Sequence, residues 1–534
     1  MSAGGEQASG AGASARSSAL AVPLLGVFAG IQAADPIINT NALVKASRAL
    51  EMSTGVETLA ASISTLALAA TVMSTGLLAD RLGRRRVLLG ALLVAIVGDT
   101  LVALAPSSGV FLIGRAVAGV GLGAVFAAAF AYLRAVTTAA TLARGVGIFS
   151  AVASVTMIAL SFLGGIVATG DWRIAFLLVP ALALLTLPAT LRVLPVEEPI
   201  KGTGGDVAGQ VLLALGVIFF LVGASHAVKG FTRPETLVGL LGGAALLGAF
   251  AIVERRRENP FFPMSILRSP LFLAAVGAGF IYNFGMSVTL LQTADVWQYA
   301  NHFKDSAVSL GQFPFFFGGI ASAVYVGHRM SAGVGARKVI VIASIVAAAG
   351  FFTMLGHSEH SSYLSYVPGL ILIGVGVTAA SVPYGSLVLE SIGPSFRRFF
   401  GSVTSSRTTI GQFAYALGLA FSTVMVDRLT DGGVVRKLER AGVPPSQTGQ
   451  GLDQIAIYVQ SGKNPATALG QRAMLDALPS YSHAFVATMC MSGALMLLAG
   501  FGSWWALRRP DPTVTDDVAP VTPAPPPARV PEPV

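Results

Sequence analysis

Long apolar stretches separated by short polar segments run along almost the whole chain. A helix needs about 20 mostly apolar residues to cross the hydrocarbon layer of a membrane. Fourteen stretches meet that length, so the pattern predicts an all-α, polytopic membrane protein with about fourteen transmembrane helices. We expect these helices near residues 18–38, 57–79, 86–105, 109–133, 146–168, 174–193, 210–228, 236–253, 271–292, 307–327, 338–356, 364–388, 400–426 and 483–507.

The composition supports this interpretation and narrows the chemistry. Of 534 residues, 54% are hydrophobic and 11% are charged, less than half of the roughly 25% that is typical of soluble domains. A disordered chain is excluded, and a soluble enzyme is disfavoured, because both need far more charge. The single cysteine, Cys490, offers neither an internal disulfide nor a metal cluster. No phosphate-binding loop is present, which argues against ATP hydrolysis by this chain. We also expect no metal, no cofactor and no enzymatic activity.

The basic residues indicate the orientation of the chain. With the N-terminus in the cytoplasm, twenty Lys and Arg residues fall in cytoplasmic segments and six in the short outer loops. Positive residues concentrate on the cytoplasmic side of membrane proteins. We therefore expect a multi-pass protein of the plasma (inner) membrane with both termini cytoplasmic. This asymmetry also explains the net charge of +9 without nucleic acid as a partner; the expected partner is the lipid bilayer.

The polar interruptions divide the chain into five parts. We expect two six-helix bundles, separated by a linker with an inserted helix pair, and a short disordered tail at each end. The second bundle contains a long polar segment that we expect to be an extracellular loop. The parts are the N-tail 1–17, the first bundle 18–194, the linker and helix pair 195–260, the second bundle 261–509 with its loop 427–482, and the Pro-rich tail 510–534.

A charged motif occupies the predicted cytoplasmic turn between the second and third helices. It reads Gly-Leu-Leu-Ala-Asp-Arg-Leu-Gly-Arg-Arg-Arg over residues 76–86. An acid at the end of one helix and a basic cluster opening the next form a charge latch that can hold or release neighbouring helices. The simpler alternative is an arginine cluster that only fixes topology. The expected latch residues are Gly76, Asp80, Arg81, Gly83, Arg84 and Arg85.

This motif resembles the signature loop of the major facilitator superfamily. A weaker copy with Gly327, Arg329 and Gly335 lies after the tenth predicted helix, as two related halves would leave. The inserted helix pair is similar to that of the fourteen-helix drug:proton antiporters. The resemblance implies a secondary active transporter that exports drug-like or amphipathic compounds by alternating access. Its partners would then be a small-molecule substrate and protons, and we expect a monomer.

Three ionisable residues lie within predicted membrane helices: Asp35, Asp99 and Arg115. Such residues cost at least about 2.5–3.5 kcal/mol on insertion scales, which makes each a functional candidate. Asp35 matches the first-helix acid of the drug:proton group, and the resemblance implies that it carries a coupling proton; the alternative is an acid that reaches the outer interface. Asp99 and Arg115 fall at the same depth, so we expect them to pair, either as a proton-responsive element or as a static salt bridge.

Other polar residues are candidates for a substrate cavity. Asn39 matches the asparagine of the first-helix motif in the resembling group. The remaining candidates lie on or near the ninth predicted helix, where interhelical hydrogen bonding is the alternative role. They are Tyr282, Asn283, Gln292 and Gln298.

One departure from the family leaves the transport mode open. The fifth helix of these antiporters carries Gly-Pro-x-x-Gly-Gly, whereas this chain has Leu160, Ser161, Gly164 and Gly165 at the corresponding positions. Without the proline the helix retains its amide hydrogen bond and loses the expected kink. Antiport, symport and uniport all remain open. Two other functions also remain: a dedicated exporter or flippase of an envelope lipid or metabolite, and a transport-inactive receptor or scaffold.

Overall fold

The computed structural model describes residues 4–508 except 198, 200–205, 228–229, 231, 300–302, 304–307, 309, 462–464 and 466. Within this part of the chain the regular elements are all helices, as the apolar pattern predicts. The main helices are α1 (Gly4–Ala49), α2 (Thr54–Leu82), α3 (Arg84–Ala103), α4 (Ser108–Val136), α5 (Leu142–Gly170), α6 (Trp172–Val193), α7 (Val207–His226), α8 (Pro234–Arg256), α9 (Pro270–Tyr299), α11 (Phe313–Ser331), α12 (Ala336–Phe352), α13 (Tyr363–Glu390), α14 (Phe400–Arg440), α15 (Pro445–Ser461) and α16 (Ala468–Ala506). Short 3₁₀ turns η2 (Met264–Arg268), η3 (Thr353–Gly356) and η4 (Pro394–Phe399) lie between them.

Thirteen of the described helices are long and apolar enough to cross a membrane. They account for every predicted span except 307–327, where α11 stands instead. That helix has 19 residues and carries His328 and Arg329 in its last turn, which lowers its apolarity. It packs against α5 and α13. The chain is therefore a multi-pass, all-α membrane protein.

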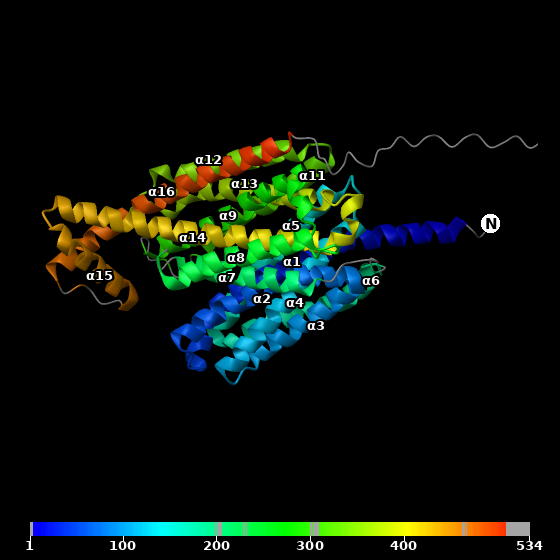
Figure 1. Ribbon diagram of the computed structural model, residues 1–534, viewed down its shortest axis with the longest axis horizontal. Helices are drawn as coiled ribbons and strands as arrows, with labels where there is room; N and C mark the ends of the chain where they lie inside the picture. The colour runs from blue at the N-terminus through cyan, green and yellow to red at the C-terminus, as the bar shows by residue number, and fades with distance from the viewer. Residues whose placement is uncertain are drawn as a thin grey trace, which may run out of the picture.

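The helices form two groups and an accessory pair. Helices α1 to α6 pack against one another, and α9, α11, α12, α13, α14 and α16 form the second group. The pair α7–α8 lies beside α2 and α14, between the two groups (Figure 1). The domain boundaries that the sequence gives for two six-helix bundles and an inserted pair stay a prediction.

Small residues let neighbouring helices approach closely. A Cβ atom on Gly98 of α3 would lie 2.3 Å from the backbone nitrogen of Ala118 in α4. Between α7 and α8, a Cβ on Gly239 would lie 2.3 Å from the Cα of Gly223. Because lipid tails are as apolar as the side chains, helices in a membrane associate through close packing rather than through the hydrophobic effect. Some of the 61 glycines of the chain thus lie where neighbouring helices touch, and their lack of a side chain lets these helices pack closely.

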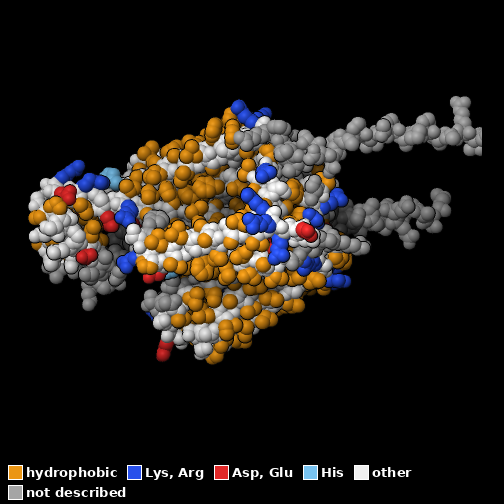
Figure 2. Space-filling view, viewed as in Figure 1, with side chains coloured by type: hydrophobic (Ala, Val, Ile, Leu, Met, Phe, Trp, Pro, Cys, Tyr) orange, Lys and Arg blue, Asp and Glu red, His pale blue; other side chains and the backbone are white. Residues whose placement is uncertain are grey.

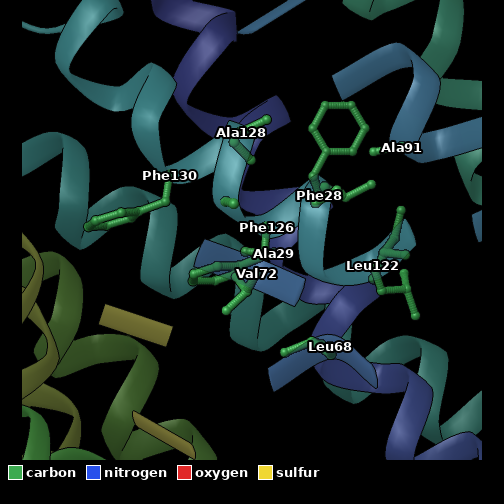
Figure 3. Packing of buried hydrophobic residues seen from close by; sticks show 14 of the residues in the cluster. Phe28, Ala29, Leu68, Val72, Ala91, Leu122, Phe126, Ala128 and Phe130 are labelled. Atoms are coloured by element: carbon green, nitrogen blue, oxygen red, sulfur yellow. The ribbon is translucent and has the colours of Figure 1, made fainter. Parts of the chain in front are cut away.

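The largest buried cluster lies within the first bundle. Figure 3 shows Phe28 of α1, Leu68 of α2, Ala91 of α3 and Leu122 of α4 converging on one core. Each of the four side chains is at most 5% exposed. Side chains from four helices thus fix the positions of these helices relative to one another.

Two predicted irregular segments are helical in the structure. Helix α1 begins at Gly4, so residues 4–17 are helical where the sequence predicts disorder; this segment contains several alanines and no proline, a composition that permits a helix. The predicted loop 427–482 is wrong as a loop: α14 continues to Arg440, α15 follows, and α16 begins at Ala468. A small core of Val434, Leu438 and Ala473 holds this projection together. The predicted tail 510–534 lies outside the described residues.

The surface separates an apolar flank from a basic end. Figure 2 shows hydrophobic side chains along the flank of the bundle, and Lys and Arg at both ends; on the projection at the left they are mixed with Asp and Glu, whereas at the right-hand end they gather with few acids. We call this end, which carries the turn at Gly83, the turn after α11 and the start of α14, the basic end. At the opposite end, α14 and α16 continue beyond the other helices and carry α15 (Figure 1).

The contact at Gly98 gives a test of the packing. We expect Gly98→Val to lower the free energy of unfolding by about 1–3 kcal/mol, because its side chain would overlap the backbone of α4. Gly90→Val is the matched control, since Gly90 lies on the same helix and a Cβ there meets nothing within 4 Å. Denaturant unfolding of the purified protein in detergent measures the difference. Equal stability of the two variants would contradict the close α3–α4 contact.

Candidate functional site

A buried ion pair joins α4 to α1 in the middle of the first bundle. The Arg115 side chain is 1% exposed and that of Asp35 is 3% exposed. Arg115 Nη1 donates to Asp35 Oδ1 at 2.6 Å, and Nη2 donates to Asp35 Oδ2 at 2.9 Å. Two parallel hydrogen bonds of this kind are the strongest geometry available to an arginine and a carboxylate.

A second carboxylate reaches the same guanidinium from α3. Asp99 is fully buried, and its Oδ1 lies 3.7 Å from Arg115 Nη1. Neither carboxylate oxygen of Asp99 has a hydrogen-bond partner in the described part of the chain. One positive charge therefore faces two carboxylates, so the cluster has a net charge of −1 when both are ionised and becomes neutral when it binds one proton.

The neighbouring backbone explains how four helices meet at this point. Ser64 of α2 donates its hydroxyl to Asp35 Oδ2 at 3.0 Å. That approach depends on Gly119 of α4, where a Cβ would lie 2.2 Å from the carbonyl oxygen of Ser64. Gly98 brings α3 equally close to α4, which places the following residue, Asp99, beside Arg115. We call Asp35, Ser64, Asp99 and Arg115 the Arg115 cluster.

The sequence predicts part of this geometry. The expected Asp99–Arg115 pair is present at 3.7 Å. The sequence gives no sign that Asp35 shares this arginine, whereas in the structure Asp35 is the main partner of Arg115. Ser64 is a residue that sequence reasoning misses, because a serine in a predicted membrane helix carries no signal that distinguishes it from other polar contacts.

The predicted latch lies at the basic end and joins the two bundles. Asp80 of α2 is 2% exposed, and its Oδ2 accepts a hydrogen bond from the backbone nitrogen of Gly401 in α14. Arg84 Nη2 lies 3.7 Å from Asp80 Oδ1, and Arg84 Nη1 donates to Glu197 at 2.8 Å. The guanidinium of Arg84 also stacks over the ring of Phe400, 4.3 Å from its centroid.

Glycines allow the latch to close. Gly83 has a φ of 90°, a left-handed conformation that favours glycine, and it makes the tight turn between α2 and α3. A Cβ on Gly401 would lie 2.0 Å from the carbonyl oxygen of Gly76, so α2 and α14 meet backbone to backbone. Arg85 donates to the carbonyl of Leu191 on α6.

Further contacts between the bundles lie at the same end. Arg134 of α4 donates to the carbonyl of Leu389 on α13 at 2.6 Å. Ser331, the last residue of α11, accepts a hydrogen bond from the backbone nitrogen of Arg144 at 2.8 Å. Beside these contacts a cleft of about 280 Å³ is lined by residues of both bundles, including Ala143 and Glu390. The conformation described here is therefore closed at the basic end.

The predicted cavity residues occupy separate places. Asn39 is 1% exposed and donates to the carbonyl of Ala60 at 3.1 Å. Asn283 donates to Gly279 within its own helix at 2.8 Å, and Tyr282 beside it is half-buried. Gln292 is 1% exposed, whereas Gln298 is exposed. In the described part of the chain none of them forms a hydrogen bond with the Arg115 cluster, and a shared cavity stays a prediction.

In the described part of the chain, no three His, Cys, Asp or Glu side chains lie close enough together to hold a metal ion. The two carboxylates and the guanidinium of the Arg115 cluster can bind a proton and pair their charges.

Comparisons with known proteins agree with this architecture. The family model for the Major Facilitator Superfamily matches residues 21–419. Multidrug resistance protein Stp of Mycobacterium tuberculosis is 28% identical over 420 residues, which cover 78% of this chain and 76% of that protein. Cephamycin export protein CmcT of Amycolatopsis lactamdurans is also 28% identical, covering 76% of this chain and 84% of that protein.

Among solved structures, the proton:xylose symporter XylE superposes with a TM-score of 0.58 at 12% identity. The match covers 92% of this chain and 95% of XylE. At this identity the similarity is one of fold.

The shared guanidinium gives a test by mutation. We expect Arg115→Gln to destabilise the protein by about 3–5 kcal/mol, because it leaves buried carboxylates without their cation. Adding Asp35→Asn to this variant should restore part of the loss, since one of the two carboxylates is then removed. Denaturant unfolding in detergent measures both. An Arg115→Gln variant as stable as the parent would show that the ion pair is not a buried structural contact.

The α2–α14 contact gives a second test. We expect Gly401→Val to open the basic end, because the new side chain would overlap the backbone of Gly76. The readout is the rate of maleimide labelling at Ser405→Cys, a buried position facing Gly76, in a Cys490→Ser background. Labelling should become about tenfold faster, the effect of roughly 1.4 kcal/mol on the opening equilibrium. Gly393→Val is the control, because a Cβ there meets nothing within 4 Å; similar rates in both variants would contradict the role of the contact.

Proposed function

The chain belongs to the major facilitator superfamily, and from that premise we propose that it exports drug-like or amphipathic compounds from the cytoplasm in exchange for protons. The observation that carries the proposal is the Arg115 cluster, in which two buried carboxylates compete for one guanidinium. The names of its relatives, a multidrug resistance protein and a cephamycin export protein, support export as the direction of transport. The protein then acts as a transporter and not as an enzyme.

The hydrogen bonds of the cluster suggest how one proton changes it. In the conformation described here Asp35 holds both guanidinium bonds and the bond from Ser64, while Asp99 has no hydrogen bond from a described residue. A proton on Asp99 would make this state neutral, which a low-dielectric interior favours. When the proton moves to Asp35, Arg115 is released to pair with Asp99, and the hold of α4 on α1 weakens.

The latch supplies the second state that such a mechanism needs. By the concentration of positive charge we assign the basic end to the cytoplasm, so the structure corresponds to a cytoplasm-closed state. Opening this side would break the Asp80–Gly401 hydrogen bond and separate Gly76 from Gly401. Helix α2 carries both Ser64 of the cluster and Asp80 of the latch, and we propose that this helix couples proton binding to closure.

A dedicated exporter of an envelope lipid or metabolite is the second candidate. Two features favour it: α5 runs as one helix from Leu142 to Gly170 through the position of the missing Gly-Pro, and α14, α15 and α16 form a helical projection at the outer end. A lipid released at that end would contact this projection. The export of a small drug would not require such a structure.

Proton movement in proteoliposomes tests the proposal. A pH-sensitive dye in the lumen reports protons while amphipathic compounds of positive, zero or negative charge are added outside. We expect the parent protein to move protons in response to at least one class, and Asp35→Asn and Asp99→Asn each to reduce the rate at least about tenfold, because each removes one of the two proton acceptors. Asp453→Asn, at an exposed acid on α15, is the control and should leave the rate unchanged.

Three other outcomes are informative. No proton movement with any compound, in protein that remains monodisperse, would remove antiport and favour the lipid or metabolite exporter. Flux of a compound without proton movement would indicate uniport. Unchanged flux in both Asp variants would contradict the role of the Arg115 cluster.

A further inference from the structure

A second buried arginine lies between the bundles in a very different environment. Arg407 of α14 is 7% exposed. Its guanidinium carbon lies 4.6 Å from the ring centroid of Phe130, 5.6 Å from that of Phe126 and 4.7 Å from that of Tyr384. Three aromatic faces from two other helices thus surround this cation.

Arg407 has no anionic partner in the described part of the chain. None of the ion pairs between described residues includes Arg407, and its Nε is buried without a hydrogen-bond partner. The other buried arginine, Arg115, has two carboxylates. A buried cation costs several kcal/mol unless it is compensated, and three desolvated aromatic faces return about 2 kcal/mol each. The rings therefore offset much of this cost, but they supply neither an opposite charge nor a hydrogen-bond acceptor for the guanidinium.

Tyr384 links α13 to α14 at this point. Its hydroxyl donates to the carbonyl of Arg407, and its ring centroid lies 4.7 Å from the Arg407 guanidinium carbon. A buried guanidinium that lies among aromatic rings, with an Nε that has no described partner, suits an anion that carries an apolar body.

The position of the rings makes this site depend on conformation. Phe126 and Phe130 belong to the first bundle, whereas Tyr384 and Arg407 belong to the second. In Figure 3, Phe130 lies at the edge of the core cluster. Arg407 is six residues beyond Gly401, about 9 Å along the helix from the α2–α14 contact. Separation of the bundles at the basic end would withdraw both phenylalanines and leave Arg407 facing the opening.

We propose that Arg407 binds the anionic group of the transported compound when the basic end is open. The substrate class is an amphipathic anion: a carboxylate, sulfonate or phosphate on an aromatic or apolar body. The guanidinium binds the anionic group, and the rings of Phe126 and Phe130 contact the apolar body. Closure replaces the anion with the two rings, which weakens binding as the substrate leaves. This inference rests on the proposed function and specifies its substrate.

Binding of three matched probes tests the assignment. The probes are 2-naphthoate, its neutral amide 2-naphthamide, and 2-naphthylmethylammonium, which share one aromatic body and differ in charge. Radiolabelled probes are bound to the full chain in phosphatidylcholine nanodiscs without a proton gradient, and empty nanodiscs correct for partition into lipid. We expect naphthoate to bind at least about tenfold more tightly than the other two, the contribution of one charge-assisted hydrogen bond.

Variants separate binding from structure. Arg407→Gln should weaken naphthoate about tenfold or more and leave naphthamide unchanged, whereas Arg407→Lys should retain part of the preference for the anion. Arg398→Gln, at an exposed arginine before α14, is the control and should change nothing. If Arg407→Gln fails to fold, the Lys variant and the parent's selectivity carry the test. Equal affinity of the parent for all three probes, or an equal loss for all three in the Gln variant, would overturn the proposal.

Anionic lipid headgroups carry the same kind of charged group as the proposed substrate, so a separate experiment must distinguish them from a free compound. If phosphatidylglycerol nanodiscs weaken naphthoate binding to the parent and not to Arg407→Gln, the site binds an anionic headgroup; if they have no effect, it binds the free compound. Both outcomes support an anion site. Loss of charge selectivity with proton exchange intact refutes only this inference, whereas selective binding without proton exchange refutes only the proposed function.

Discussion

One guanidinium shared by two carboxylates is the constraint on which the first bundle depends. Arg115, Asp35 and Asp99 are all buried, in a region where an unpaired charge costs several kcal/mol. The three helices that carry these charges, together with α2, must therefore stay close enough for the charges to compensate one another. The glycines that permit this approach, Gly98 and Gly119, are as necessary to the site as the charges.

The same helix extends this constraint to the interface between the bundles. Ser64 on α2 bonds to Asp35, and Asp80, sixteen residues later on the same helix, holds the start of α14. At 1.5 Å per residue the two points are about 24 Å apart. A shift of α2 that loosens one contact thus acts on the other through a rigid element. We propose that the contacts of the Arg115 cluster, the latch and Arg407 all change when the basic end opens.

Much of this was accessible from the sequence, and the limits have physical reasons. Apolar length and the basic residues predict the helices and the two bundles, because both reflect the cost of transfer into lipid. The Asp99–Arg115 contact follows from helix depth alone. The rotation of each helix about its axis decides which of the two acids forms the hydrogen bonds with Arg115. Depth in the membrane does not give this rotation, so the sequence did not predict the Asp35–Arg115 pair. The helices of the projection formed by α14, α15 and α16 were not predicted either, because a helix outside the membrane needs no long apolar stretch. Arg407 at a predicted helix start looks like a topogenic charge until the three rings around it are seen.

We propose that the Arg115 cluster holds one exchangeable proton, which Asp99 carries in the closed conformation. Infrared difference spectroscopy of the protein against Asp99→Asn tests this, because a protonated carboxyl and a carboxylate absorb at different frequencies. We expect the substitution to remove a protonated-carboxyl band that shifts in deuterium oxide. Loss of a carboxylate band instead would show that Asp99 is ionised in this state and that the proton is not held there.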